Sequence, residues 1–138
     1  MIFVDTSFWV ALASSRDDRH DDARTLLQRF GGERLATSNH VRGETWTFIS
    51  RRHGHAAAVA LLERLEVSQR LRVLFTGQEL EEEALRWLRR HDERQYSFVD
   101  ATSFALMHSL RIRQALAFDG DFSAAGLEEL RPDATRPG

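Results

Sequence analysis

Short apolar runs alternate along the whole chain with longer segments of helical periodicity. The first run, residues 1–4, stops at Asp5 and is followed at once by a helical stretch that starts near Thr6. A run of this kind is typical of a buried parallel strand that leads into a helix. The other predicted strands are 35–37, 72–75, 115–118 and a short one around Leu130. The alternation predicts the α/β class, a parallel sheet with helices on both faces.

Five segments carry apolar side chains at helical spacing. They are residues 17–30, 39–52, 55–68, 78–91 and 98–110. The last is apolar nearly all round, which predicts a helix that is buried on most sides.

The length of 138 residues suits one domain, predicted over residues 1–131, with a loosely held tail at 132–138. The chain has no cysteine, which excludes disulfides and thiolate metal sites and fits a reducing compartment. No apolar run approaches the roughly 20 residues that cross a bilayer, and the start of the chain lacks the basic region of a signal peptide. We therefore expect a cytoplasmic protein with no membrane partner.

The charge balance limits the chemistry. The net charge is −2, so the chain is no strongly basic nucleic-acid binder. All 19 basic residues are arginine, which excludes mechanisms that need a lysine. Any contact with phosphate must come from arginine, backbone amides or a metal ion.

Several acids stand where function is expected. Asp5 and Asp119 follow predicted strands, and Asp121 comes two residues later. In open parallel sheets, functional groups gather beyond the carboxyl ends of the strands. Glu44 and Asp100 have apolar neighbours at helical spacing, and a carboxylate on such a face is costly to bury without a partner.

Each acid also has an ordinary structural explanation. Asp5 could begin a helix as its N-cap, and Asp100 could close a capping box with Ser97. Glu44 could pair with a buried arginine such as Arg42 or one from another helix. The two acids that flank the glycine of the AFDGDF stretch could be turn residues.

If the acids converge, they need a cation. Two unit charges about 4 Å apart repel by about 4 kcal/mol at an effective dielectric constant near 20. An oxygen-only site without cysteine suits a hard cation, Mg²⁺ or Mn²⁺, and such a site can hydrolyse phosphodiesters.

Four stretches resemble one known family: MIFVDTSFWVAL, GETWTF, YSFVDATSFALM and AFDGDF. Their order and spacing are similar to those of PIN-domain ribonucleases, and among them of the VapC-type toxins of bacterial toxin–antitoxin pairs. The resemblance covers about residues 1–131. It implies a three-layer α/β/α sandwich with a short central parallel sheet and the acids grouped at one end.

The resemblance also implies roles for the acids. Asp5, Glu44, Asp100 and Asp119 match the acidic quartet of the family and are the predicted catalytic residues, and Asp121 matches a further acid. The predicted ligands of Mg²⁺, with Mn²⁺ as a possible substitute, are Asp5, Asp100, Asp119 and Asp121. Glu44 would bind a second metal or deprotonate the attacking water.

Two positions near the acids qualify this match. Ser7 falls where a hydroxyl often supports the first aspartate. Many members have Thr or Ser two residues before the last aspartate of the quartet, where this chain has Ala117.

The resulting hypothesis is a metal-dependent endoribonuclease that acts as a toxin. The implied partners are an RNA substrate, a small protein antitoxin that occludes the cleft, and a second copy of the chain. Residues 7–13, with Phe8 and Trp9, offer an apolar surface for partners, although packing in the core is the expected role of at least one of these two side chains. Candidate RNA contacts are arginines and aromatics, for which a solvated helix face and the core, respectively, are the more usual places: Arg51, Arg52, Arg90, Arg94, Trp9, Trp46 and Tyr96.

Two other functions stay open at this point. A phosphoacceptor domain also has acids at strand ends, but it needs a lysine that this chain lacks. A non-catalytic RNA- or protein-binding module could share the fold, although retention of all four acids argues against it.

Overall fold

Five parallel strands form the central sheet of the structure, a computed structural model that describes residues 1–133. The order across the sheet is β3-β2-β1-β4-β5, and every neighbouring pair is parallel. The strands are β1 (Ile2–Val4), β2 (Leu35–Ser38), β3 (Leu71–Leu74), β4 (Gln114–Leu116) and β5 (Glu128–Glu129).

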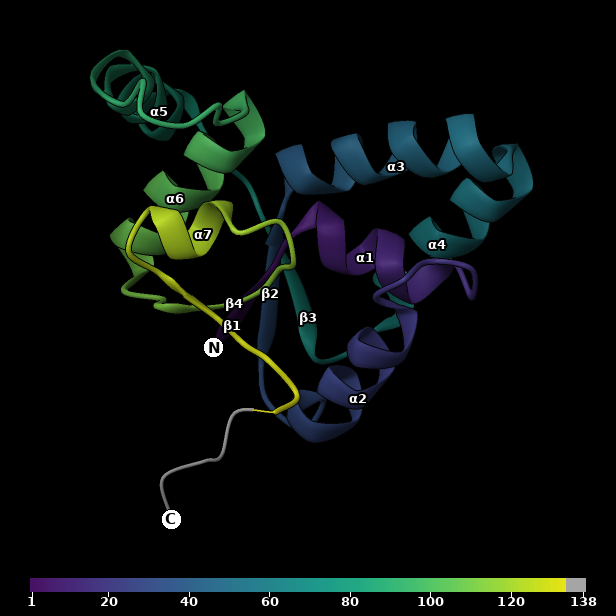
Figure 1. Cartoon of the computed structure of the whole chain (residues 1–138). Coiled ribbons are helices and arrows are strands. Elements are labelled where there is room, and N and C mark those ends of the chain that lie inside the picture. The colour runs from purple at the N-terminus through teal and green to yellow at the C-terminus, as the bar shows by residue number, and fades with distance from the viewer. Residues whose placement is uncertain (134–138) are drawn as a thin grey trace.

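Helices cover both faces of this sheet (Figure 1). Helices α1, α2 and α4 lie on one side, and α6 and α7 lie on the other, with α5 packed against α6. This arrangement confirms the predicted three-layer α/β/α sandwich. The helices are α1 (Thr6–Ala13), α2 (His20–Phe30), α3 (Asn39–His53), α4 (His55–Val67), α5 (Gln78–Arg90), α6 (Phe98–Leu110) and α7 (Asp121–Ala124).

The middle strand, β1, explains why the chain begins with an uninterrupted apolar run. Ile2, Phe3 and Val4 are all fully buried, because both faces of β1 are covered by helices and both edges are paired. The run ends at Asp5, where the chain leaves the sheet and α1 begins.

The order of the strands creates the crevice in which a functional site is expected. From β1 the chain moves outward through β2 to β3, and then crosses back to place β4 on the other side of β1. The direction of winding therefore reverses between β1 and β4. At such a reversal, the connections after the two strands separate and leave room beyond their carboxyl ends.

Two predicted elements near this crevice were displaced. The strand predicted at 115–118 ends at Leu116, so that Ala117 and Phe118 separate it from Asp119. The final strand, predicted around Leu130, is β5, which ends one residue before Leu130. Helix α7 was not predicted, since four residues are too few for a periodic pattern.

Smaller differences occur elsewhere. The helix predicted from residue 17 begins at His20, because the Asp17 carboxylate accepts a 2.8 Å hydrogen bond from the amide of Arg19 in a turn. The strand predicted at 72–75 is β3, one residue earlier, and Phe75 is left 68% exposed.

The end of the described chain lies against α2. The carbonyl of Pro132 accepts a 2.6 Å hydrogen bond from Nη1 of Arg29. Residues 134–138 of the predicted tail lie outside the described residues, and the predicted domain end at residue 131 stays a prediction.

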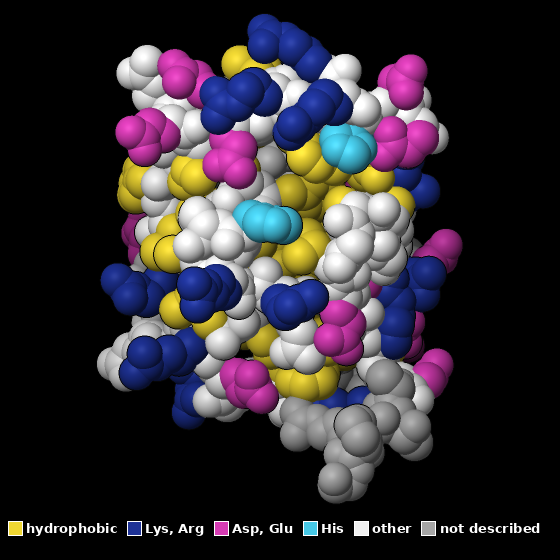
Figure 2. All heavy atoms as spheres, turned by 90° about the vertical axis from the view of Figure 1, so that its left-hand side faces the viewer, with side chains coloured by type: hydrophobic (Ala, Val, Ile, Leu, Met, Phe, Trp, Pro, Cys, Tyr) yellow, Lys and Arg dark blue, Asp and Glu magenta, His cyan; other side chains and the backbone are white. Residues whose placement is uncertain are grey.

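The surface carries both signs of charge. Figure 2 shows the face toward which α5, α6 and α7 lie, where arginine and acidic side chains intermingle around exposed apolar ones, with no single large basic patch. In residues 1–133, no helix combines the length and the apolar character needed to cross a bilayer.

Candidate metal centre and active site

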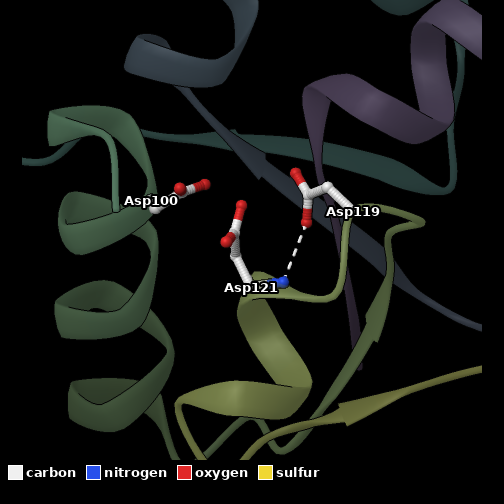
Figure 3. A group of neighbouring side chains, drawn as sticks. All are labelled: Asp100, Asp119 and Asp121. Atoms are coloured by element: carbon white, nitrogen blue, oxygen red, sulfur yellow. Dashed lines mark hydrogen bonds between the residues drawn. The ribbon is translucent and has the colours of Figure 1, made fainter. Parts of the chain in front are cut away.

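Three carboxylates meet beyond the carboxyl end of β4. One oxygen each of Asp100, Asp119 and Asp121 can be chosen such that all three lie within 4.8 Å of one another. Figure 3 shows that they come from different segments: Asp100 from the first turn of α6, Asp119 from the loop after β4, and Asp121 from the start of α7. The Asp119 Oδ1 also accepts a hydrogen bond of 3.2 Å from the amide of Asp121.

Asp5 lies at the end of the neighbouring strand and is 2% exposed. Its Oδ2 accepts hydrogen bonds from the amide of Ser7 at 3.2 Å and from the Ser7 hydroxyl at 2.8 Å, so Asp5 is the N-cap of α1. The same hydroxyl accepts a 3.0 Å hydrogen bond from the amide of Phe118. Ser7 thereby ties the end of β1 to the loop after β4.

Asp100 has a structural role of the same kind. Its Oδ2 accepts from the amide of Ser97, and its own amide donates to the Ser97 hydroxyl, both at 3.0 Å, which completes a capping box. The structural explanations of Asp5 and Asp100 are therefore both correct. They do not exclude a metal site, because in each residue the capping bonds use Oδ2, and within residues 1–133 the Oδ1 atoms accept no hydrogen bond.

The acids raise one another's pKa. Burial raises the pKa of Asp5 to about 7, with a further contribution from the charge of Asp119. Burial also raises the pKa of Asp100 to about 7, and the charges of Asp121 and Asp119 add to it. Asp119 is exposed as a whole residue, but the partial burial of its carboxyl group raises its pKa, as does the charge of Asp121. The cluster therefore favours either protons or a cation at neutral pH.

Glu44 lies on α3, outside the group of three closest carboxylates. It lines a cavity of about 370 Å³ together with Asp5, Ser7 and Asp119. Glu44 is half-buried, and no salt bridge joins it to an arginine among the described residues. The alternative in which Glu44 pairs with Arg42 is not observed, and the Arg42 guanidinium lies 5.4 Å from the centre of the Phe75 ring.

One arginine does touch the acidic cluster. Arg94, in the loop before α6, donates from Nε to the Oδ1 of Asp121 at 2.6 Å and from Nη2 to the carbonyl of Asp119 at 3.0 Å. Between these acids Gly120 has a φ of 82°, and a Cβ at this position would stand 3.1 Å from the Arg94 Nη2. Glycine is therefore favoured for two reasons, the left-handed backbone and the close guanidinium.

The other predicted RNA contacts divide into two groups. Arg51 and Arg52 line a cavity of about 670 Å³ that also includes Glu44. The aromatic side chains pack inside instead. Trp9 is 6% exposed, Trp46 packs against a smaller buried cluster, and the ring of Tyr96 lies 4.7 Å from that of Trp87.

Two further predictions concern residues that do not face the acidic cluster, Arg90 and the apolar side chains of α1. Arg90 lines a separate cavity of about 230 Å³ between α5 and α6. Phe8 is fully buried, as Trp9 nearly is, because their face of α1 packs onto the sheet. The core-packing role that we expected for at least one of Phe8 and Trp9 is therefore confirmed for both, and these two side chains add little to a surface for partners.

A buried acid near the cluster went unrecognised in the sequence. The Glu129 carboxylate accepts hydrogen bonds from the amides of Gly120 and Ser123 and pairs with Arg131. Nothing in the local sequence separates it from the exposed Glu128 beside it. Strand alternation would have turned one of the two inward, but the strand was not placed correctly.

The donor set fits a hard divalent cation. The clustered side chains offer only carboxylate oxygens, and neither cysteine nor histidine joins them among the described residues. Asp5 and Asp100 can be ionised at the same time as the neighbouring acids only when a positive charge offsets the repulsion among the carboxylates. Arg94 offsets the charge of Asp121 alone, so the cluster retains excess negative charge.

Comparison with known proteins identifies the family of the chain. The PIN domain family model matches residues 2–127. The chain is 56% identical over 133 residues to a protein of Mycobacterium tuberculosis named 23S rRNA-specific endonuclease VapC20, across 96% of this chain and all of that relative. The same relative is found in a second strain of the organism with equal identity.

A solved structure shows the same fold. The crystal structure of Mycobacterium tuberculosis VapC20, described as a sarcin–ricin loop cleaving toxin, superposes with a TM-score of 0.89 at 55% identity. The match covers 96% of this chain and all of that one. With the sandwich fold and the grouped acids, these matches show that the chain belongs to the PIN-domain family, as one of its VapC-type toxin endoribonucleases.

Proposed function

We propose that the chain is a Mg²⁺-dependent endoribonuclease toxin, with Mn²⁺ as a possible substitute, and that its substrate is the sarcin–ricin loop of 23S ribosomal RNA. The observation that carries the catalytic proposal is the convergence of Asp100, Asp119 and Asp121 within 4.8 Å at the crevice of the sheet. The relatives named above support the substrate, because they match this chain over nearly its whole length.

We assign the cation to Asp100, Asp119 and Asp121, with Asp5 adjoining them. Capping bonds hold Asp5 and Asp100 from one oxygen each, so that both are oriented before any ligand binds. A divalent cation at this position supplies Lewis-acid activation of the phosphodiester and of the attacking water.

Glu44 has the role of general base or water-orienting group in this proposal. It lines the same cavity as Asp5 and Asp119 but stands outside the group of closest carboxylates. A carboxylate in this position can accept the proton of the water that attacks the phosphorus. In-line attack leaves a 5′-phosphate and a 3′-hydroxyl, products that need no participation of the 2′-hydroxyl of RNA.

RNA binding then depends on arginine rather than on a broad basic surface. Arg51 and Arg52 lie along the larger cavity that includes Glu44, where they can contact phosphates on one side of the scissile bond. The Arg52 guanidinium also lies 4.8 Å from the centre of the Phe48 ring, which holds it at this cavity. The exposed Phe98, at the start of α6, offers a further stacking surface.

The proposed partners follow from the VapC-type family. A small antitoxin that fills the cavity beside Glu44 would block access to the acids, and its apolar contacts would be Phe48 and Val99. We also propose a homodimer in the cytoplasm, which a measurement of molecular mass in solution would test.

The proposal is tested by cleavage of an RNA that contains the sarcin–ricin stem–loop, with mapping of both new ends. We expect cleavage within the loop with Mg²⁺, none with EDTA, and none by Asp5→Asn or Asp100→Asn. A control RNA with the same stem and a scrambled loop should remain intact. Full activity of both Asn variants would remove these acids from the mechanism, and tight RNA binding without turnover would favour the non-catalytic module instead.

A further inference from the structure

Glu129 is a buried carboxylate that the proposed reaction does not use. Its side chain is 1% exposed, although it lies in β5 at the edge of the sheet. Oε1 accepts hydrogen bonds from the amide of Gly120 at 3.2 Å and from Nη2 of Arg131 at 2.8 Å, and Oε2 accepts one from the amide of Ser123 at 2.8 Å. A carboxylate so buried persists only where such donors replace its lost water.

The charge of Glu129 is retained by these contacts. Burial alone raises the pKa of a carboxyl group, but the hydrogen bonds from Ser123, Arg131 and Gly120 outweigh it and hold the pKa of Glu129 below its ordinary value. The carboxylate therefore acts as a fixed anion rather than as a proton carrier.

Arg131 binds the same loop, residues 117–123, at its start. Its Nη1 donates to the carbonyl of Ala117 at 2.7 Å and to that of Leu130 at 2.9 Å. Its guanidinium also lies 5.4 Å from the centre of the Phe118 ring. Glu129 and Arg131, which we call the clamp pair, thus hold residues 117–123 before and after the acids.

The loop after β4 and helix α7 depend on tertiary contacts for their conformation. Helix α7 has only four residues, and a helix of one turn is unstable without tertiary support. Its N-cap, Gly120, has no side chain to satisfy the first amides. Glu129 supplies the missing acceptor for Ser123, while Asp119 accepts from the amide of Asp121.

We propose that Glu129 and Arg131 are positioning residues of the metal site, which fix Asp119 and Asp121 by holding the loop between β4 and α7. The inference rests on the proposed function in one respect, that these two acids help to bind the cation. It adds that the geometry of the site depends on a pair of residues in β5 and just after it, outside the acidic cluster.

The test compares Glu129→Gln with Glu128→Gln. Glutamine keeps the size of the side chain and one acceptor oxygen, but its amide nitrogen cannot accept from Gly120 or Ser123. Glu128 is the matched control, because it precedes Glu129 in the same strand, is exposed, and among the described residues its side chain hydrogen-bonds only Gln114. The readouts are the Kd for Mn²⁺, measured by calorimetry without RNA, the Tm in EDTA, and kcat and KM at saturating Mn²⁺.

We expect Glu129→Gln to weaken Mn²⁺ binding by about tenfold or more, the range found when a supporting partner of a metal ligand is removed. At saturating Mn²⁺, the kcat of Glu129→Gln should lie closer to the wild-type value than its Kd for Mn²⁺ does. The KM for RNA should change little. Glu128→Gln should match the wild type throughout. If Glu129→Gln does not fold, Arg131→Gln serves as the second variant, since Arg131 is 34% exposed and its replacement should weaken Mn²⁺ binding in the same direction.

The outcomes separate this inference from the proposed function. If the wild type binds Mn²⁺, Asp100→Asn does not, and the clamp variants bind it with wild-type Kd, the clamp is a stability element only and the inference is overturned. A lower Tm with unchanged Kd leads to the same conclusion. If the wild type itself binds no Mn²⁺, the proposed metal site fails and the inference fails with it.

Discussion

The hydroxyl of Ser7 donates a 2.8 Å hydrogen bond to the Oδ2 of Asp5. Because that hydroxyl also accepts from the amide of Phe118, one side chain orients the acid after β1 and anchors the loop after β4. Ser7 thus joins the ends of β1 and β4, the neighbouring strands that Asp5 and Asp119 follow.

Replacement of Ser7 by alanine tests this shared contact. Ser7→Ala leaves the amide of Phe118 without its acceptor, which we expect to cost about 1–2 kcal/mol of unfolding free energy. The hydroxyl of Ser7 lowers the pKa of Asp5 through its hydrogen bond, and the amide of residue 7 continues to donate in the variant, so loss of the hydroxyl alone raises this pKa further and shifts the acidic limb of the kcat/KM profile to higher pH. Ser109→Ala, which removes a hydroxyl bonded only within α6, is the control. An unshifted profile in Ser7→Ala would contradict the role given to Ser7.

Replacement of Asp100 separates capping from chemistry. In Asp100→Asn the side-chain carbonyl can still accept from the amide of Ser97, so α6 should persist while cleavage falls by about 10²-fold or more. Ser97→Ala is the converse variant, since it loses the N-cap at a cost of about 1 kcal/mol but keeps the carboxylate. Single-turnover cleavage and thermal unfolding of both variants are the measurements. Equal loss of activity in the two would assign Asp100 a structural role only.

The stability of the metal-free protein should fall as the pH rises. Asp5 and Asp100 have folded pKa values of about 7 against 3.8 for an ordinary aspartate, so the folded state holds more protons between these limits. Their contribution is fully present below about pH 4 and is lost as the pH rises through about 7. The lowered pKa of Glu129 affects stability only in more acidic solution, below the ordinary glutamate pKa of 4.5, where its contribution is lost as the pH falls.

Thermal unfolding in EDTA at about pH 5 and about pH 8 checks this expectation. We expect the Tm to be lower at the higher pH, by about 3–8 °C for a difference on the order of 1–2 kcal/mol. Saturating Mg²⁺ should abolish most of the difference, because the cation replaces the protons. Asp5→Asn should reduce the slope in EDTA. A Tm that rises between the two pH values would refute the raised pKa values.

Arg94 should compete weakly with the cation. Its guanidinium lies 2.6 Å from Asp121, so its removal leaves the cluster more negative and should strengthen Mn²⁺ binding several-fold. The effect is limited because Arg94 is exposed and screened by solvent. Arg113→Gln is the control for net charge, since Arg113 is exposed just before β4 and, within residues 1–133, its side chain makes no hydrogen bond or salt bridge to these acids. Weaker Mn²⁺ binding in Arg94→Gln would show instead that the arginine supports the site.

The sequence by itself determined the class of fold and much of the local structure. The apolar run at residues 1–4 placed β1, and the helical periodicity of residues 98–110 placed α6 with its observed bounds. Both signals could be read because each depends on residues within one element. The same local logic identified Asp5 and Asp100 as caps, and the acids at strand ends and on apolar faces as a candidate site. Their roles in metal binding and catalysis stay predictions.

Only the tertiary structure decided how these elements meet. The pairing of β1 with β4, more than a hundred residues apart, places Asp5 beside the loop of Asp119, and no local pattern encodes that choice of partner. The contact of Arg94 with Asp121 and the burial of Glu129 were out of reach for the same reason. A side chain's partner across the fold depends on the packing of the whole sheet, whereas sequence periodicity reports only which face of its own element it occupies.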